Sequence, residues 1–501
     1  MRHLLSALTV PFLVGSLHAQ QADHIPGDIM AMLDPETRPT EIVADLEQQY
    51  GSSLRLEVVR EVSAPMRTWL FHFDPTAVQE KVLLRDFRLH PGVQVAQFNH
   101  LIEERAVPND TQYSSQWHHQ NIDSEDAWDI TTGGLTATGD TIVVCVIENS
   151  DLPHPDLFAN AWFNHNEIPN NNIDDDGNGY VDDFRGWNTP GGDDDVYGGG
   201  HGTQVAGMIG AVGDNNLGVA GANWNVKIMV VDYGGVQEAA VVAAYTYPWV
   251  MRKLWRQSNG AQGAFVVSTN ASWGIDGGQP ADSPLWCAIY DSLGTEGILS
   301  CGATANQAYD VDQVGDLPTA CPSDFMVSVT ATDVNDQRTF SAWGATTIDV
   351  GAPGGNVFTT SIGGGYGNTS GTSFASPLTA GVIGLLYSAP CSSLMDQVFS
   401  DPAGAALYVR QALFDGVEQV GNLPGDVVTD GRINTFNSLQ LIMSDCGACP
   451  TPYALAVERD DTTSATVTWN ATAPGPFNLQ YQAAGDTSWT TVIGLGGTSY
   501  T

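Results

Sequence analysis

The stretch GTSFASP at residues 371–377 is the strongest single indication of how this chain folds. It follows a glycine-rich segment and opens an apolar run that continues through Leu386, which predicts a buried helix beginning near Ser373. A serine in the first turn of a helix lies beside exposed backbone amides and the positive end of the helix dipole. Both favour the negative charge that develops on a substrate oxygen. A capping role would account for one hydroxyl but not for the whole heptapeptide.

A second helix start carries the candidate base. The stretch HGTQVAG at residues 201–207 follows three glycines at 198–200 and predicts a helix with His201 in its first turn. Serine attack on a peptide carbonyl needs a base within hydrogen-bond reach and an acid that orients the base. Ser373 and His201 supply two of these three groups.

Both stretches resemble those of the subtilisin-like serine proteases, the subtilase family. Residues 371–377 agree with the family's nucleophile segment in every characteristic position, whereas Gln204 stands where a second histidine is common. The resemblance covers roughly residues 110–445 and implies that Ser373 is the nucleophile and His201 the base.

The pattern of the same region independently predicts an α/β fold. Apolar runs alternate with helical stretches, which is typical of a doubly wound, mostly parallel sheet covered on both faces. The clearest runs are residues 141–147, 226–231, 265–268 and 298–300.

The acid segment departs from the family, which ends its first core strand with an aspartate. Here the strand at 141–147 is followed directly by Glu148, and counting from the strand places Glu148 at the acid position. Asp151 is the alternative. A chain without a working acid is expected to lose about four orders of magnitude in turnover.

Two further segments resemble parts of the family's substrate site. Residues 297–306 match the segment that ends in the oxyanion-stabilising asparagine, which implies that Asn306 has this role. Ser272, Trp273 and Gly274 resemble the edge segment that pairs with an extended substrate backbone. An ordinary strand end is the alternative for this tripeptide.

Between the candidate acid and base lies the acidic stretch IDDDGNGYVDD at residues 173–183. It has oxygen donors at alternating positions and a glycine at the sharp turn, as in an EF-hand-type calcium loop. The expected ligands are Asp174, Asp176, Asn178, the Tyr180 carbonyl and Asp182. Arg185 occupies the twelfth position, where such a loop has glutamate, and Asp183 is a candidate to close the shell. We expect a structural calcium ion here, with a solvated acidic loop as the alternative.

The charge balance bears on possible partners. The chain has 57 acidic and 18 basic residues and a formal net charge of -39, which repels nucleic acids and anionic membranes. After the N-terminal region no uninterrupted apolar run reaches roughly 18 to 20 residues, so no membrane span is expected.

Flanking segments predict a secreted precursor. Residues 1–19 read as a signal peptide, because their apolar run is too short to span a bilayer. Residues 20–108 follow the order strand, helix, strand, strand, helix, strand, which is typical of a ferredoxin-like α+β domain. In this position it resembles the inhibitory prodomain of subtilases, with an unrelated α+β module as the alternative. Its expected elements are strands at 28–33, 54–59, 68–73 and 93–98 and helices at 40–50 and 75–87.

We expect the catalytic domain over residues 109–445 and a linker over 446–452. Residues 453–501 alternate with the period of β-strands and resemble the first half of a fibronectin type III sandwich. The chain is therefore expected to end within this domain and to be a fragment. Among seven cysteines we expect Cys287 to pair with Cys321, and Cys391 with Cys446 or Cys449. Cys145 and Cys301 lie in apolar runs and are expected to be buried thiols.

Together these observations predict a secreted, monomeric serine endopeptidase that acts on protein or peptide substrates and is restrained by its own prodomain. The altered acid segment leaves open a catalytically impaired pseudoprotease that serves as a binding module. A carboxyl-type peptidase that pairs serine with glutamate is a third reading, and the His201 segment argues against it because that chemistry needs no histidine.

Overall fold

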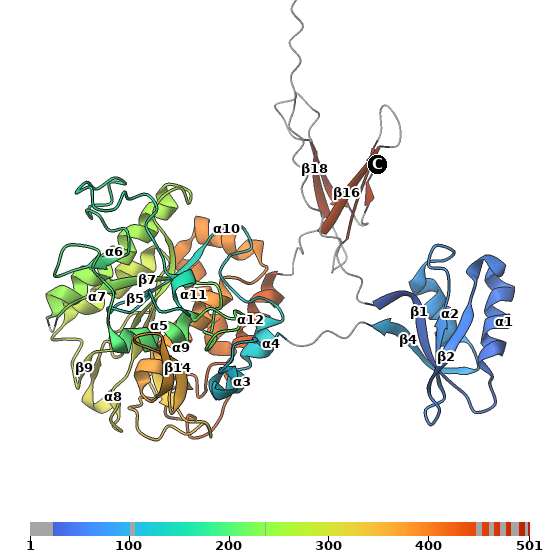
Figure 1. Cartoon of the computed structure of the whole chain (residues 1–501), viewed down its shortest axis with the longest axis horizontal. Coiled ribbons are helices and arrows are strands. Elements are labelled where there is room, and N and C mark those ends of the chain that lie inside the picture. The colour runs from blue at the N-terminus through green and yellow to red at the C-terminus, as the bar shows by residue number, and fades with distance from the viewer. Residues whose placement is uncertain are drawn as a thin grey trace, which may run out of the picture. The chain divides into compact units, whose positions relative to one another are not determined.

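The computed structural model describes residues 24–100, 106–235 and 237–446, together with five strands between residues 453 and 500 (Figure 1). The chain divides into two compact units, whose main parts are residues 1–104 and 105–451. Within the described residues, none of the helices has the length and apolar character needed to cross a bilayer. The predicted signal peptide at 1–19 lies outside the described residues.

The N-terminal unit has the predicted order of strands and helices. Its antiparallel sheet has the strand order β2-β3-β1-β4 and packs around a core that contains Phe71, Phe73 and Phe87. Helix α2 begins at Glu80 and not at residue 75, because the Asp74 carboxylate accepts hydrogen bonds from the Thr76 amide (3.0 Å) and hydroxyl (2.6 Å), which favours a turn. The elements are β1 (His24–Leu33), α1 (Pro39–Tyr50), β2 (Glu57–Ser63), β3 (Thr68–His72), α2 (Glu80–Leu89) and β4 (Val93–His100).

A seven-stranded parallel sheet organises the second unit and confirms the predicted fold class. Its order is β13-β12-β10-β8-β5-β7-β6, and every neighbouring pair is parallel. The strands are β5 (Ile142–Val146), β6 (Trp187–Asn188), β7 (Lys227–Asp232), β8 (Phe265–Ala271), β10 (Leu299–Ala303), β12 (Met326–Thr332) and β13 (Val350–Pro353).

Helices cover both faces of this sheet, which explains why its strands read as continuous apolar runs. Along β5, Ile142, Val144 and Val146 enter one core, and Val143 and Cys145 enter the other. The first core is covered by α5 (Gly200–Gly210), α9 (Thr372–Leu386), α10 (Ser392–Ser400), α11 (Pro402–Asp415) and α12 (Thr435–Asp445). The second is covered by α6 (Glu238–Gln257) and α7 (Pro284–Thr295).

Shorter elements complete this unit. They are α3 (Trp117–Asn121), α4 (Ser124–Trp128), β9 (Ile275–Asp276), α8 (Val311–Val314), β11 (Asp316–Leu317), β14 (Val357–Ser361) and β15 (Gly365–Thr369). Strands β9 and β11 form a separate two-stranded antiparallel sheet.

The cysteines behave as predicted. Disulfides join Cys287 to Cys321 and Cys391 to Cys446, while Cys145 and Cys301 are buried free thiols. Cys449, the other predicted partner of Cys391, lies outside the described residues.

The C-terminal segment contains strands β16 (Tyr453–Arg459), β17 (Ala465–Asn470), β18 (Phe477–Tyr481), β19 (Thr490–Leu495) and β20 (Ser499–Tyr500). They form antiparallel pairs in two groups, β16-β17-β20 and β18-β19. Strands thus occur where alternation predicted them, and the fibronectin type III assignment stays a prediction.

Candidate active site

The carboxyl ends of three sheet strands converge on one region. Glu148 follows β5, the segment 272–274 follows β8, and Asn306 follows β10. Within the sheet, β7 lies on one side of β5 and β8 on the other, so the order of the strands reverses at β5. Parallel α/β sheets form ligand crevices where the strand order reverses in this way.

Glu148 and His201 form a hydrogen-bonded pair. The Glu148 Oε2 atom lies 2.8 Å from His201 Nδ1. The side chain of Glu148 is 10% exposed and that of His201 is 45% exposed, so the acid lies behind a ring that remains accessible. A Cβ atom at Gly202 would lie 3.0 Å from Glu148 Cγ and 2.2 Å from the Asn149 carbonyl oxygen. Glycine at this position therefore lets the start of α5 approach the end of β5.

The pKa values of His201 and Glu148 are both raised above their ordinary values. The hydrogen bond and charge of Glu148 raise the pKa of His201 above its ordinary value, against the opposing effect of burial. Burial raises the pKa of Glu148, and the hydrogen bond to His201 opposes that rise. The carboxylate therefore stabilises the charged imidazolium that forms when the ring accepts a proton.

Asp151, the alternative acid, points elsewhere. Its Oδ2 atom accepts a hydrogen bond from the Gly363 amide at 3.0 Å, and its own amide donates to the Thr203 hydroxyl at 2.9 Å. Of the two carboxylates considered from the sequence, the structure brings Glu148 to the His201 ring.

Ser373 occupies the first turn of α9 and is 8% exposed. In a regular helix its carbonyl would accept a bond from the amide of residue 377, but Pro377 has none. The Ser272 hydroxyl replaces that donor at 2.8 Å from the Ser373 carbonyl oxygen. This bond fixes the candidate nucleophile to the end of β8.

The starts of α5 and α9 lie together. The two helices pack side by side (Figure 1), and the centroid of the His201 ring lies 5.6 Å from that of Phe374, the residue after Ser373. The Ser373 hydroxyl donates a long hydrogen bond, 3.3 Å, to the Ser272 carbonyl oxygen. Catalytic hydrogen bonds often form or shorten only when substrate binds. The geometry is therefore compatible with transfer of the Ser373 proton to His201.

Asn306 is oriented by Thr372, the residue that precedes Ser373. Its Oδ1 atom accepts a hydrogen bond from the Thr372 amide at 2.9 Å. The carbonyl end of the side chain is held in this way, and its Nδ2 group is the end that can donate a hydrogen bond. Asn306 and Ser373 line the same cavity, so this amide is suited to donate to an oxygen bound there.

The segment of Ser272, Trp273 and Gly274 leaves the end of β8 and lines the same cavity. Trp273 donates from its indole nitrogen to the Ile147 carbonyl oxygen at 2.7 Å and stacks on Tyr233 with ring centroids 4.3 Å apart. These contacts hold the segment rigidly beside Ser373.

Sequence reasoning missed the residues that support Ser272. Asn270 donates from Nδ2 to the Ser272 hydroxyl oxygen at 2.9 Å, and its Oδ1 accepts from the Ser376 hydroxyl at 2.7 Å. Ser376 and Pro377 belong to the quoted 371–377 stretch. The missing amide of Pro377 was the signal that a donor must come from another part of the chain.

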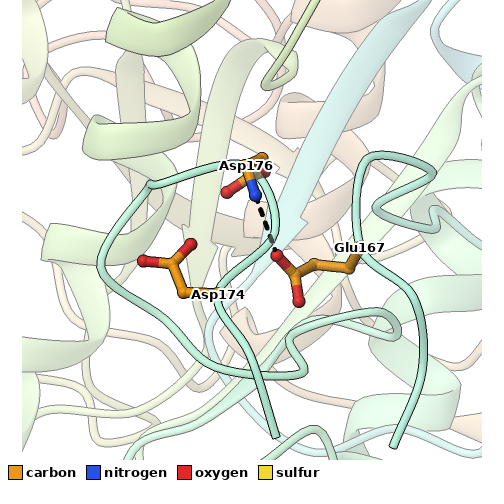
Figure 2. Close-up of side chains that lie close together, drawn as sticks. All are labelled: Glu167, Asp174 and Asp176. Atoms are coloured by element: carbon orange, nitrogen blue, oxygen red, sulfur yellow. Dashed lines mark hydrogen bonds between the residues drawn. The ribbon is translucent and has the colours of Figure 1, made fainter. Parts of the chain in front are cut away.

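The acidic loop brings together a different set of carboxylates from the predicted one. Glu167, Asp174 and Asp176 each offer a carboxylate oxygen, and these oxygens lie within 4.8 Å of one another (Figure 2). Glu167 is 4% exposed, and its Oε1 accepts from the amides of Asp175 (2.7 Å) and Asp176 (3.3 Å). Burial raises the pKa of Glu167, and the nearby charges of Asp176 and Asp175 add to that rise.

The structure departs from the predicted ligand pattern at Asp182, whose carboxylate accepts from the amides of Asn171 and Asn172, both at 2.9 Å. Asn178 donates to the Asp176 carboxylate at 3.3 Å and to the Asp183 carboxylate at 2.9 Å.

Asp183 and Tyr180 anchor the loop to the core. The Asp183 carboxylate accepts from the Tyr247 hydroxyl at 2.6 Å, and the Tyr180 ring packs against Tyr247 with centroids 4.9 Å apart. Asp183 therefore ties the loop to α6 and does not join the carboxylate cluster.

Comparison with known proteins adds independent information. The sequence profile of Peptidase S8, the subtilase family, matches residues 139–423. Over 343 residues the chain is 29% identical to an extracellular protease of Xanthomonas campestris pv. campestris, a match that covers 63% of this chain and 55% of that protein. It is 28% identical over 347 residues to an extracellular basic protease of Dichelobacter nodosus, with 63% and 54% covered. The chain thus spans about half the length of these two relatives.

Two further comparisons cover nearly the whole of the other protein. The chain is 27% identical over 345 residues to thermitase of Thermoactinomyces vulgaris, which covers 67% of this chain and 99% of thermitase. Among solved structures, a protease from Pseudoalteromonas arctica superposes with a TM-score of 0.50 at 23% identity, over 67% of this chain and all of that one. At that identity the likeness shows a shared fold.

Proposed function

Because the chain belongs to the subtilase family, we propose that it is a serine endopeptidase whose catalytic groups are Ser373, His201, Glu148 and Asn306. The observation that carries the proposal is the 2.8 Å hydrogen bond that a buried carboxylate accepts from an accessible imidazole, beside a serine at a helix start. Glu148 here takes the part that an aspartate has in the subtilases that the chain resembles.

In the first half of the reaction, the Ser373 oxygen attacks the carbonyl carbon of a substrate peptide bond while His201 accepts the hydroxyl proton. Asn306 donates a hydrogen bond to the oxygen that becomes negative, and Glu148 stabilises the imidazolium. The carbon–nitrogen bond then breaks. The leaving amine takes the proton from His201, and the acyl group remains on Ser373 as an ester.

In the second half, water attacks the ester carbon and gives a proton to His201. The carbon–oxygen bond to Ser373 breaks, and that proton returns to the serine oxygen. The products are a carboxylic acid and an amine, so the overall reaction consumes one water and leaves the enzyme unchanged.

Replacing Asn306 with alanine is expected to lower kcat by about 10²- to 10³-fold, because one preorganised donor to the oxyanion is lost. KM is expected to stay within about threefold, since the oxygen carries little charge before attack. Steady-state kinetics on a peptide p-nitroanilide measures both. A fall in kcat of less than about threefold would remove Asn306 from the proposal.

Casein digestion tests the function itself. The full chain, expressed as a precursor and allowed to mature, is expected to release peptides and to be inactivated by phenylmethylsulfonyl fluoride. A pseudoprotease would release none, with the wild type no more active than its Ser373→Ala variant. A carboxyl-type peptidase would work in acid and tolerate His201→Ala, whereas our proposal requires activity to rise through the histidine pKa.

The flanking segments support secretion as a precursor. The N-terminal stretch 1–19 has signal-peptide character, and two of the relatives are named extracellular. The βαββαβ unit over residues 24–100 has the size and position of an inhibitory prodomain. We accordingly assign residues 20–108 to a prodomain, 109–445 to the catalytic domain, 446–452 to a linker and 453–501 to a fibronectin type III-like segment, in a monomeric enzyme.

The carboxylates of Glu167, Asp174 and Asp176 fit a calcium ion. Two oxygens bound to one Ca²⁺ at about 2.3–2.6 Å lie at most about 5 Å apart, which accommodates the 4.8 Å limit of this cluster. The ion would offset the repulsion that helps to raise the pKa of Glu167. Its contribution would be to stiffen the loop before His201, with no part in bond cleavage.

Removing calcium with EGTA is expected to lower the Tm of the Ser373→Ala protein by roughly 5 °C or more, since a saturating ligand stabilises by about 2–3 kcal/mol. In the Glu167→Gln variant the same treatment is expected to change the Tm by less than about 2 °C. Asp195→Asn, which changes an exposed aspartate outside the cluster, serves as the charge-matched control. Equal calcium responses in both variants would argue against this site. The Ser373→Ala background prevents self-digestion during heating.

A further inference from the structure

A cavity of about 250 Å³ adjoins the candidate nucleophile. Ser373 and Asn306 line it, and so do the segment 272–274 and two acidic residues, Asp276 and Asp316. When a substrate binds, the carbonyl carbon under attack lies between Ser373 and Asn306. That carbon is bonded directly to the α-carbon of the same substrate residue. The side chain of that residue, on the acyl side of the cleaved bond, is therefore the part of the substrate closest to the cavity.

The two acidic residues lie directly opposite each other on neighbouring strands. Asp276 of β9 pairs directly with Asp316 of β11 in the antiparallel register, so their side chains project from the same face. Like charges at directly opposed positions are destabilising. Within the described part of the chain, neither carboxylate forms an ion pair with a lysine, arginine or histidine.

The hydrogen-bond partners of these carboxylates are neutral. Asp316 is 2% exposed and accepts from the hydroxyls of Thr304 (3.1 Å) and Thr319. Asp276 is exposed and accepts from the Gln307 side-chain amide at 3.0 Å. Burial raises the pKa of Asp316 to about 7, and the charge of Asp276 adds to the rise. A cation between the two would offset the repulsion and give both carboxylates a partner of opposite charge.

This inference rests on the proposed function and names its substrate class. We infer that the cavity receives the side chain of an arginine or lysine whose carbonyl carbon Ser373 attacks, with Asp316 and Asp276 as its charge partners. A long aliphatic stem can cross the cavity while its charged end reaches the carboxylates. A glutamate side chain would be repelled by the same two groups.

The chain carries one such residue at the boundary between its two units. Arg105 is the only lysine or arginine between Arg88 and Arg185. The backbone nitrogen of the next residue, Ala106, donates to the Asp129 carboxylate at 2.6 Å. Hydrolysis of the Arg105–Ala106 bond adds water, so that Arg105 gains a carboxylate and Ala106 a free amino group. That amino group is largely protonated at neutral pH. It would form a charge-assisted bond with Asp129 that the uncut chain lacks.

The test compares kcat/KM for five substrates, succinyl-Ala-Ala-Pro-X p-nitroanilides with arginine, lysine, methionine, phenylalanine or glutamate at X. We expect the matured wild type to prefer arginine and lysine over methionine by at least about tenfold, and glutamate to be the poorest. Asp316→Asn and Asp276→Asn are each expected to lower the arginine-to-methionine ratio by about tenfold or more. Asp282→Asn, an exposed aspartate outside the cavity, is the matched control and should leave the ratio unchanged.

The outcomes distinguish the proposed endopeptidase activity from the inferred preference for arginine or lysine. Cleavage of methionine or phenylalanine substrates at least as fast as arginine ones overturns the inference and leaves the proposed function standing. Cleavage of none of the five overturns both. Because Asp316 is buried, its variant can fail to fold, and the exposed Asp276 then carries the charge test alone.

Processing gives a second readout on the full chain. N-terminal sequencing of the matured protein is expected to begin at Ala106, and Arg105→Lys should preserve that start while Arg105→Gln should lose it. A mature protein that begins at another residue in all three chains would contradict the assignment of Arg105 as a substrate residue.

Discussion

Replacing Ser373 with alanine is expected to lower kcat by about 10⁴- to 10⁶-fold. The variant keeps the base and the oxyanion donor but has no oxygen with which to form the acyl bond. Binding is expected to persist, because the Ser272 hydroxyl still donates to the carbonyl of residue 373 and holds the start of α9. The measurement is kcat and KM on a peptide p-nitroanilide.

Ser444→Ala is the matched control for this prediction. Ser444 is an exposed serine near the end of α12 whose hydroxyl donates only locally, to the Leu441 carbonyl oxygen at 2.8 Å. Its loss should leave kcat within about twofold. If Ser373→Ala retained more than a hundredth of wild-type kcat, another residue would have to be the nucleophile.

Replacing Glu148 with glutamine is expected to lower kcat by about 10³- to 10⁴-fold. The amide has nearly the size of the carboxylate but carries no charge, and it does not enforce the ring tautomer that leaves Nε2 free to accept a proton. Folding should be little affected, because the side-chain volume is kept.

The same substitution is expected to change the pH profile. The wild-type ring must be neutral to accept the serine proton, so activity falls as the pH drops through the His201 pKa. Glu148 raises that pKa, which places the acid limb of wild-type kcat/KM above the ordinary histidine range near 6.5. Without the charge the burial effect remains, so the acid limb should move to lower pH. Profiles of kcat/KM between pH 5 and 9 measure the shift.

Asp151→Asn provides the control, because Asp151 was the other acid that the sequence allowed and its carboxylate bonds to the Gly363 amide. It should keep most of the activity and the wild-type acid limb. The reverse result, in which Asp151→Asn is the crippled variant and Glu148→Gln is active, would transfer the role of the acid to Asp151.

Much of the fold could be predicted because its signals are local. The apolar run at 141–147 became strand β5, which lies between β8 and β7 and is buried on both faces. The glycine-led stretches at 201–207 and 371–377 became the starts of α5 and α9. The order of elements in the N-terminal unit followed from periodicity as well. The start of α2 did not, because a side-chain turn at Asp74 competes with helix formation.

The candidate site could be predicted where one residue type in one short motif suffices. Ser373, His201 and Asn306 belong to such motifs, and counting along β5 favoured Glu148 over Asp151. Residues that act through long-range pairing left no local signal. Glu167 lies before the acidic loop and joins it through the backbone amides of residues 175, 176 and 182. Asp276 and Asp316 meet only because β9 and β11 pair with each other, although the two residues are far apart in the chain.

The reactivity of Ser373 toward a fluorophosphonate tests the central claim most directly. The reagent forms a bond only with a serine whose proton is removed by a positioned base. Mass mapping of the matured wild type should find one modified serine, Ser373, and the label should disappear in His201→Ala and fall sharply in Glu148→Gln. An unmodified wild type, or a label on Ser373 that persists without the histidine, would contradict the account.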